Sequence, residues 1–121
     1  MNQSNIVYKT VIQAKALNKK NNMRAWGNRL IKSPKLATYE KLLEDHFKKT
    51  CQAPPWLNNI KLYVNFTFGD KRRRDLQNCF DILCDKMNGI IYIDDSQITM
   101  LEASKCYKKD IWEIEIIIEL I

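Results

Sequence analysis

The sequence predicts a small single α+β domain over residues 1–121, in which a mixed β-sheet carries two helices on one face. Three observations predict this class. The length of 121 residues suits one modest hydrophobic core, and the 45% apolar and 28% charged fractions are those of an ordinary globular protein. Segments with an apolar residue at every second position alternate with segments of helical spacing, which gives the predicted order βαβαββ.

The N-terminal half predicts a strand, a basic loop and a helix. Residues Asn5–Ala14 place apolar side chains among polar ones and are expected to form the first strand. Residues 15–35 carry seven cations and no acidic residue, so we expect a long, mobile basic loop. Ser33 before Pro34 is typical of a helix start, and this helix is expected to end near Cys51.

The C-terminal half predicts three strands and a second helix. Ile60–Phe68 alternates strictly between apolar and polar residues, as a half-buried strand does. Asp75 is a suitable N-cap for a helix that stops at Gly89. Gln97–Cys106 and Trp112–Ile121 are then expected to form the last two strands.

The overall charge favours a polyanionic partner, and the apolar pattern argues against a membrane span. The formal net charge is +6, which favours nucleic acid as the partner. The longest apolar runs are far too short to span a bilayer, and the first residues lack a secretory pattern, so we expect a cytoplasmic protein. The four cysteines form no CxxC pair and lie far from the single histidine, which argues against a zinc site.

One stretch combines cations and carboxylates in the way that metal-assisted phosphodiester chemistry requires. The cations Lys71, Arg72, Arg73 and Arg74 end at Asp75. Twenty residues later, Asp94 and Asp95 follow a short apolar segment that is expected to return to the same end of the domain. Converging carboxylates would bind Mg²⁺, while arginines would hold phosphates. The alternative is structural: a helix cap, a solvated turn and a surface run of charge.

The same stretch resembles the RusA family of Holliday junction resolvases. The family pattern is Arg-Asp-x-Asp-Asn, a helix, a glycine-containing turn and then Asp-Asp-x-Gln-Val/Ile. The residues that match this pattern are Arg74, Asp75, Asn78, Asp85, Gly89, Asp94, Asp95, Gln97 and Ile98. A basic N-terminal loop, Ser33-Pro34 before a helix, and Lys105 after the Asp-Asp pair extend the resemblance over essentially the whole chain.

The resemblance implies a homodimeric, Mg²⁺-dependent endodeoxyribonuclease, with Mn²⁺ as a substitute metal. Such an enzyme binds branched DNA at four-way junctions and makes paired symmetric nicks in recombination and repair. Asp75 and Asp95 match metal-binding catalytic acids, and Asp94 matches their close neighbour. The expected DNA-binding residues are Lys71, Arg72, Arg73, Arg74, Lys19, Lys20, Arg24, Arg29, Lys32 and Lys105. Trp26, inside the basic loop, is expected either to stack on a base or to pack against protein.

Two positions depart from the family pattern and leave catalysis open. Gln77 stands where the family has its second catalytic aspartate, and Asp81 stands where it usually has a lysine. A glutamine amide oxygen can ligate a metal, but it is neutral and cannot act as a base. Asp81 lies at i+4 from Gln77, so it is a candidate catalytic residue that restores the missing carboxylate. The alternatives are a relative that binds branched DNA without cleaving it and an interaction protein whose cations keep it soluble.

Overall fold

The computed structural model describes residues 5–18 and 22–121. The elements in chain order are β1 (Ile6–Ile12), β2 (Met23–Trp26), β3 (Arg29–Lys32), α1 (Pro34–Thr50), β4 (Ile60–Phe68), α2 (Leu76–Met87), the one-turn 3₁₀ helix η2 (Asp95–Gln97), β5 (Ile98–Tyr107) and β6 (Glu113–Leu120). No helix in the described part of the chain has the length and apolar character needed to cross a membrane.

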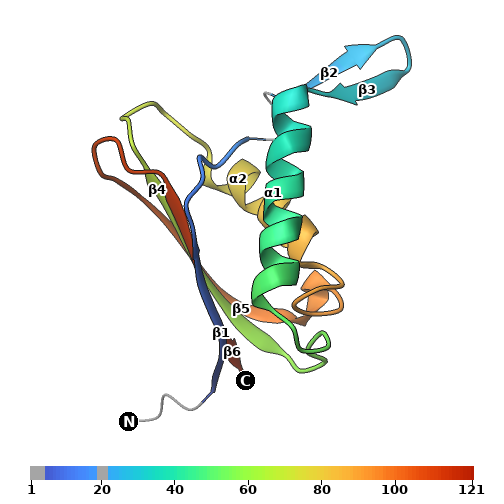
Figure 1. Cartoon of the computed structure of the whole chain (residues 1–121), viewed down its shortest axis with the longest axis vertical. Helices are drawn as coiled ribbons and strands as arrows, with labels where there is room; N and C mark the ends of the chain where they lie inside the picture. Colours follow the sequence, from blue (N-terminus) through green and yellow to red (C-terminus); the bar gives the residue numbers. More distant parts are fainter. Residues whose placement is uncertain (1–4, 19–21) are drawn as a thin grey trace.

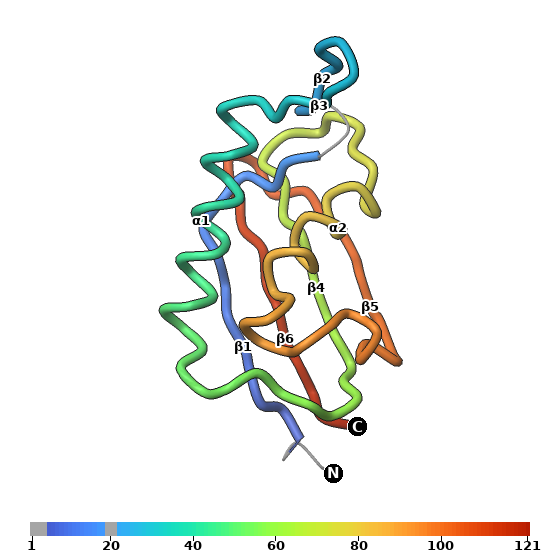
Figure 2. The backbone as a smooth tube through the Cα atoms, turned by 90° about the vertical axis from the view of Figure 1, so that its right-hand side faces the viewer, coloured from blue at the N-terminus to red at the C-terminus, as the bar shows by residue number. Residues whose placement is uncertain are grey.

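Four strands form a mixed sheet in the order β1-β6-β4-β5. β6 pairs antiparallel with both β1 and β4, whereas β4 and β5 are parallel. A parallel pair needs a crossover connection, and α2 supplies it. Figure 1 and Figure 2 show α1 and α2 on the same face of the sheet. The predicted α+β class, with a mixed sheet and two helices on one face, is therefore confirmed.

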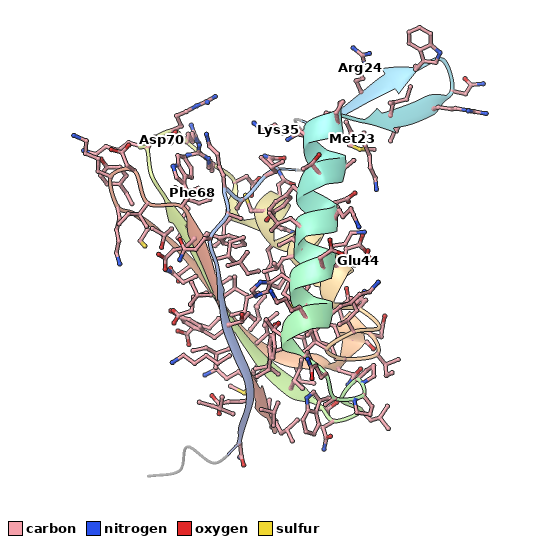
Figure 3. All side chains as sticks on the ribbon, viewed as in Figure 1. Met23, Arg24, Lys35, Glu44, Phe68 and Asp70 are labelled. Carbon is pink, nitrogen blue, oxygen red and sulfur yellow. The ribbon has the colours of Figure 1, made fainter. Side chains whose placement is uncertain are left out.

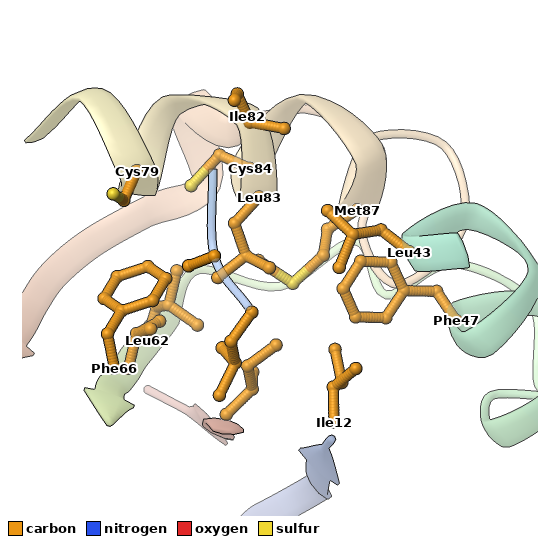
Figure 4. Close-up of a cluster of buried hydrophobic side chains, with 14 of the residues drawn as sticks. Ile12, Leu43, Phe47, Leu62, Phe66, Cys79, Ile82, Leu83, Cys84 and Met87 are labelled. Carbon is orange, nitrogen blue, oxygen red and sulfur yellow. The ribbon is translucent and has the colours of Figure 1, made fainter. Parts of the chain in front are cut away.

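The core lies between this face and the two helices. The β4 side chains that point toward the helices, from Ile60 to Phe68, are buried, as their strict alternation predicts. Leu43 and Phe47 of α1 and Leu83 of α2 have no solvent exposure (Figure 4). The helical spacing of these residues places them on one side of each helix, so burying them fixes both helices against the sheet.

The expectation of a long loop over residues 15–35 is wrong in part, because β2 and β3 form an antiparallel hairpin there. Gly27 has φ of 60°, which a two-residue hairpin turn accepts at its first central position. Each strand has four residues, and nearly all of them are exposed. No buried face therefore imposes an apolar alternation, which is the signal that reveals strands in a sequence. The hairpin projects beyond the start of α1, away from the sheet (Figure 1).

Candidate active site

Asp75 lies at the N-terminus of α2, where its carboxylate caps the helix. It accepts hydrogen bonds from the backbone N–H of Gln77 at 3.0 Å and from Nδ2 of Asn78 at 3.1 Å. The Asp75 side chain is nevertheless exposed, on the wall of an open hollow of about 550 Å³. Arg73, Arg74, Lys105 and Asn78 line the same hollow, so one carboxylate stands beside three cations there.

Lys105 reaches this hollow from the edge strand β5. It pairs with Phe66 of β4, and its Nζ donates to the backbone oxygen of Arg74 at 2.6 Å. This bond ties the end of β5 to the residue just before Asp75. Strand β5 and helix α2 therefore bring Lys105 and Asp75 to the same hollow.

The four cations Lys71–Arg74 have different surroundings. The guanidinium of Arg74 makes a two-pronged ion pair with Asp70 and lies over the rings of Phe68 and Trp112, at 4.7 and 5.1 Å from their centroids. Its hydrogen bond holds the pKa of the Asp70 carboxyl down, to about 2. Arg74 is thus held by protein groups.

Lys71, Arg72 and Arg73 are all exposed, and the ammonium of Lys71 lies 5.1 Å from the centre of the Tyr107 ring. Sequence reasoning did not include Asp70 in the site. The available signal was the spacing of four residues between Asp70 and the oppositely charged Arg74. These two side chains form an ion pair although the segment between them is not helical.

Gly69 allows Trp112 to lie beneath this arginine. A Cβ atom built on Gly69 would stand 2.5 Å from Nε1 and 2.6 Å from Cε2 of the indole. We expect Gly69→Ala to lower the free energy of unfolding by about 1–3 kcal/mol, because the packed ring has to move. Urea unfolding followed by circular dichroism measures this loss. In a Gly69→Ala, Trp112→Phe double variant the smaller ring leaves room, so the two losses should sum to more than the loss in the double variant. An unchanged unfolding midpoint in Gly69→Ala would contradict the steric argument.

Asp94 and Gln97 shape the turn that carries Asp95. The Asp94 carboxylate accepts from the N–H of Ser96 at 3.0 Å. Hydrogen bonding from the Ser96 side chain, and then from its backbone N–H, lowers the pKa of Asp94. The Gln97 side-chain oxygen accepts from the backbone N–H groups of Ile93 and Asp94. Its Nε2 donates to the carbonyl oxygens of Trp56 and Asn58, at 2.8 Å each. Both side chains therefore hold the turn in place.

Asp95 lines a second open hollow, of about 390 Å³, together with Asp81 and Asp85 of α2. Phe80, Cys84, Ile98 and Leu101 complete its wall. Asp81 thus lies with Asp95, and it does not line the hollow that contains Asp75. Gln77 is exposed on the first turn of α2, two residues after Asp75.

Asp75 and Asp95 do not converge within one chain, contrary to the sequence expectation. Asp75 follows Arg74, which bonds to Lys105 near the end of β5, whereas Asp95 precedes Ile98 at the start of β5. Seven residues of extended strand between Ile98 and Lys105 span about 23 Å. Among residues 5–18 and 22–121, no three His, Cys, Asp or Glu side chains are grouped to hold a metal. The segment Ile90–Ile93 follows the C-terminus of α2, whereas Asp75 caps the N-terminus of that helix. The length of α2 therefore separates the two carboxylates.

Three of the remaining basic candidates, Arg24, Arg29 and Lys32, belong to the β2–β3 hairpin. Arg24 and Arg29 are exposed on its two strands. Lys32 forms a 2.7 Å ion pair with Glu40 of α1, so it helps to fix the hairpin to the helix. Lys19 and Lys20 lie outside the described residues.

Comparison with known proteins gives one finding. A family model described as Endodeoxyribonuclease RusA matches residues 13–119, which is nearly the whole chain. A search of the curated proteins finds no match. The matched range contains both hollows, the hairpin, and the stretch from Lys71 to Ile98.

Proposed function

The chain belongs to the endodeoxyribonuclease RusA family, and on this premise we propose that it is a Mg²⁺-dependent nuclease that resolves four-way DNA junctions. The observation that carries the proposal is the hollow at the start of α2, where Asp75 stands beside Arg73 and Lys105. A carboxylate that can hold a metal and cations that can hold a phosphate are both needed to hydrolyse a phosphodiester. The proposed compartment is the cytoplasm, where unpaired cysteines such as the four of this chain are usual.

A second copy of the chain would complete the metal site. Strand β5 is a ten-residue edge strand, and its Met100 and Leu101 side chains are each 52% exposed. Long apolar edges are uncommon in monomers, because they offer unpaired backbone groups to other chains. We therefore propose a homodimer in which two β5 strands pair antiparallel about a two-fold axis.

Antiparallel pairing would bring the separated carboxylates together. The start of β5, next to Asp95, would then meet the end of the partner's β5, next to Lys105 and Asp75. The pairing also sets the acidic hollow of Asp81, Asp85 and Asp95 near the exposed arginines of the other copy, which is electrostatically complementary. Each dimer would contain two equivalent sites, as paired symmetric nicks require.

The residues of such a composite site suit Mg²⁺ better than those of one chain. Asp75 and the second copy's Asp95 would supply carboxylate oxygens, and Gln77 would supply an amide oxygen beside Asp75. Mg²⁺ held by these residues would supply Lewis-acid polarisation of the phosphodiester and a more acidic attacking water. Lys105 and Arg73 would hold the phosphate in the same hollow, and Arg72 would contact the flanking backbone. Asp94 would keep its role in shaping the turn, while Asp81 would add negative charge near Asp95.

A junction-binding protein with impaired catalysis is the second candidate, and Gln77 is the observation that favours it. It is exposed next to Asp75, and as a neutral amide it contributes less to metal binding than the aspartate of the family pattern. The basic surface does not depend on this position, so DNA binding would survive a loss of cleavage.

Cleavage of a synthetic four-way junction tests the proposal. We expect paired nicks in opposite strands with Mg²⁺ or Mn²⁺, and no cleavage of a linear duplex of the same sequence. Asp75→Asn is the matched control, and it should lower the cleavage rate by more than about 100-fold. Even the loss of a residue that only supports a metal ligand lowers metal affinity or activity by about 10- to 100-fold. Selective binding without cleavage in either metal would favour the second candidate. Equal binding to junction and duplex would contradict both.

A further inference from the structure

The β2–β3 hairpin is held at its base, where Met23 packs against the core, and the rest of its two strands is exposed. The backbone N–H of Ser33 donates to the carbonyl of Asn22 at 2.8 Å, which closes the base. Lys32 pairs with Glu40, a residue of α1 that is only 8% exposed. Isolated two-stranded hairpins are marginally stable, so these contacts matter for keeping it formed. Figure 3 shows Met23 at the base beside α1 and Arg24 on the projecting part.

The strand register sorts the hairpin side chains onto two faces. Trp26 pairs with Arg29, and Arg24 pairs with Ile31, so these four side chains share one face. Leu30 pairs with Ala25 on the opposite face. Trp26 is 68% exposed, and Arg29 is its direct cross-strand neighbour on this face. One face of the hairpin therefore presents an exposed aromatic residue together with two arginines.

This combination fits nucleic acid better than protein. Residues 22–32 contain Arg24, Arg29 and Lys32 and no acidic residue. A second copy of the chain has a net charge of +6, so it is a poor partner for this face. Aromatic rings bind bases by stacking, and neighbouring arginines bind the phosphates on either side.

A basic hollow connects the base of the hairpin to the proposed active site. This hollow, of about 280 Å³, is lined by Lys35 and Asn22 at the hairpin base and by Arg72 and Arg73 ahead of Asp75. A strand bound at Asp75 can therefore continue along cations to the hairpin. In a paired duplex the faces of the bases are covered by their neighbours, but at a branch point they can be unstacked.

We propose that the β2–β3 hairpin is a branch-point wedge, whose Trp26 stacks on an unstacked base while Arg24 and Arg29 hold the adjacent phosphates. This role rests on the proposed junction specificity and deepens it, because it assigns the preference for branched over linear DNA to a particular side chain. Trp26 is a specificity-determining residue in this assignment and takes no part in bond cleavage.

Binding of the whole 121-residue chain to a four-way junction and to a linear duplex of equal length tests the wedge. Trp26→Ala should weaken junction binding by roughly 10- to 100-fold, the range expected for losing a base–aromatic stack, and change duplex binding by less than about threefold. Trp26→Phe keeps an aromatic ring and should retain most of the preference. Leu30→Ala is the matched control, because it removes an equally exposed apolar side chain, 71% exposed, from the opposite face.

Photocrosslinking gives a second readout that a structural role for Trp26 would not affect. A junction with 5-iodouracil at the branch point should crosslink to the hairpin peptide of the wild-type protein, and Trp26→Ala should abolish that crosslink. If Trp26→Ala binds both DNAs equally more weakly than the wild type, or loses the mass of the dimer, the wedge is overturned. The proposed function would survive that result, provided that the wild-type protein still cleaves the junction. Wild-type protein without any junction preference would overturn the wedge and the proposed function together.

Discussion

A mixture of Asp75→Asn and Asp95→Asn proteins should nick a four-way junction that neither protein cleaves alone. Each homodimer of these variants has two defective sites, because each composite site needs Asp75 from one copy and Asp95 from the other. A mixed dimer keeps one site with both carboxylates. With free exchange of subunits about half of the dimers are mixed and each has one of two sites intact, so nicking should recover to roughly a quarter of the wild-type rate.

The recovered activity should consist of single nicks, since a mixed dimer cannot cut both opposing strands. Gel analysis of end-labelled junctions separates single nicks from paired cleavage. The Asp75→Asn, Asp95→Asn double variant mixed with wild-type protein is the control, because the defective residues then fall one in each site and mixed dimers contribute no cleavage. If the first mixture stays inactive although mass measurements show subunit exchange, both carboxylates act within one chain and the composite site is wrong.

Gln77→Asp should increase cleavage and lower the Mg²⁺ concentration needed for half-maximal rate by at least about tenfold, because the added carboxylate attracts the divalent ion. Gln77 is exposed on the first turn of α2, so the substitution leaves the core unchanged. A negative charge near a helix N-terminus is also favourable, so the gain should come without loss of stability.

Gln77→Asn is the matched control for this gain, because it has the shape of aspartate without the charge. Titration of Mg²⁺ against junction cleavage measures both variants under the same conditions. If Gln77→Asp and Gln77→Asn behave alike, charge at this position is irrelevant to the metal. If neither variant nor the wild type cleaves, the second candidate function is favoured, provided that junction binding persists.

The fold followed closely from the sequence wherever burial imposes a pattern. β4 alternates because one of its faces lies on the core, and α1 begins at Pro34 because Ser33 caps it, its Oγ accepting from Leu36 N–H at 3.0 Å. The hairpin was missed for the opposite reason. Its strands are short and exposed, so neither face requires apolar residues, and the turn glycine Gly27 was the remaining local signal.

The sequence by itself determined the chemistry of this protein: the family, the cations before α2, the Asp-Asp turn and the unusual Gln77. These are properties of residue types at fixed spacings, and local rules such as capping act over a few neighbours. Only the tertiary structure decided how these groups meet. It placed Asp75 and Asp95 at opposite ends of α2 and brought Asp81 and Asp95 to the same hollow. It also engaged Arg74 in an ion pair with Asp70. The physical reason is that the direction of each element is fixed by packing against the sheet, and that packing depends on contacts between distant parts of the chain.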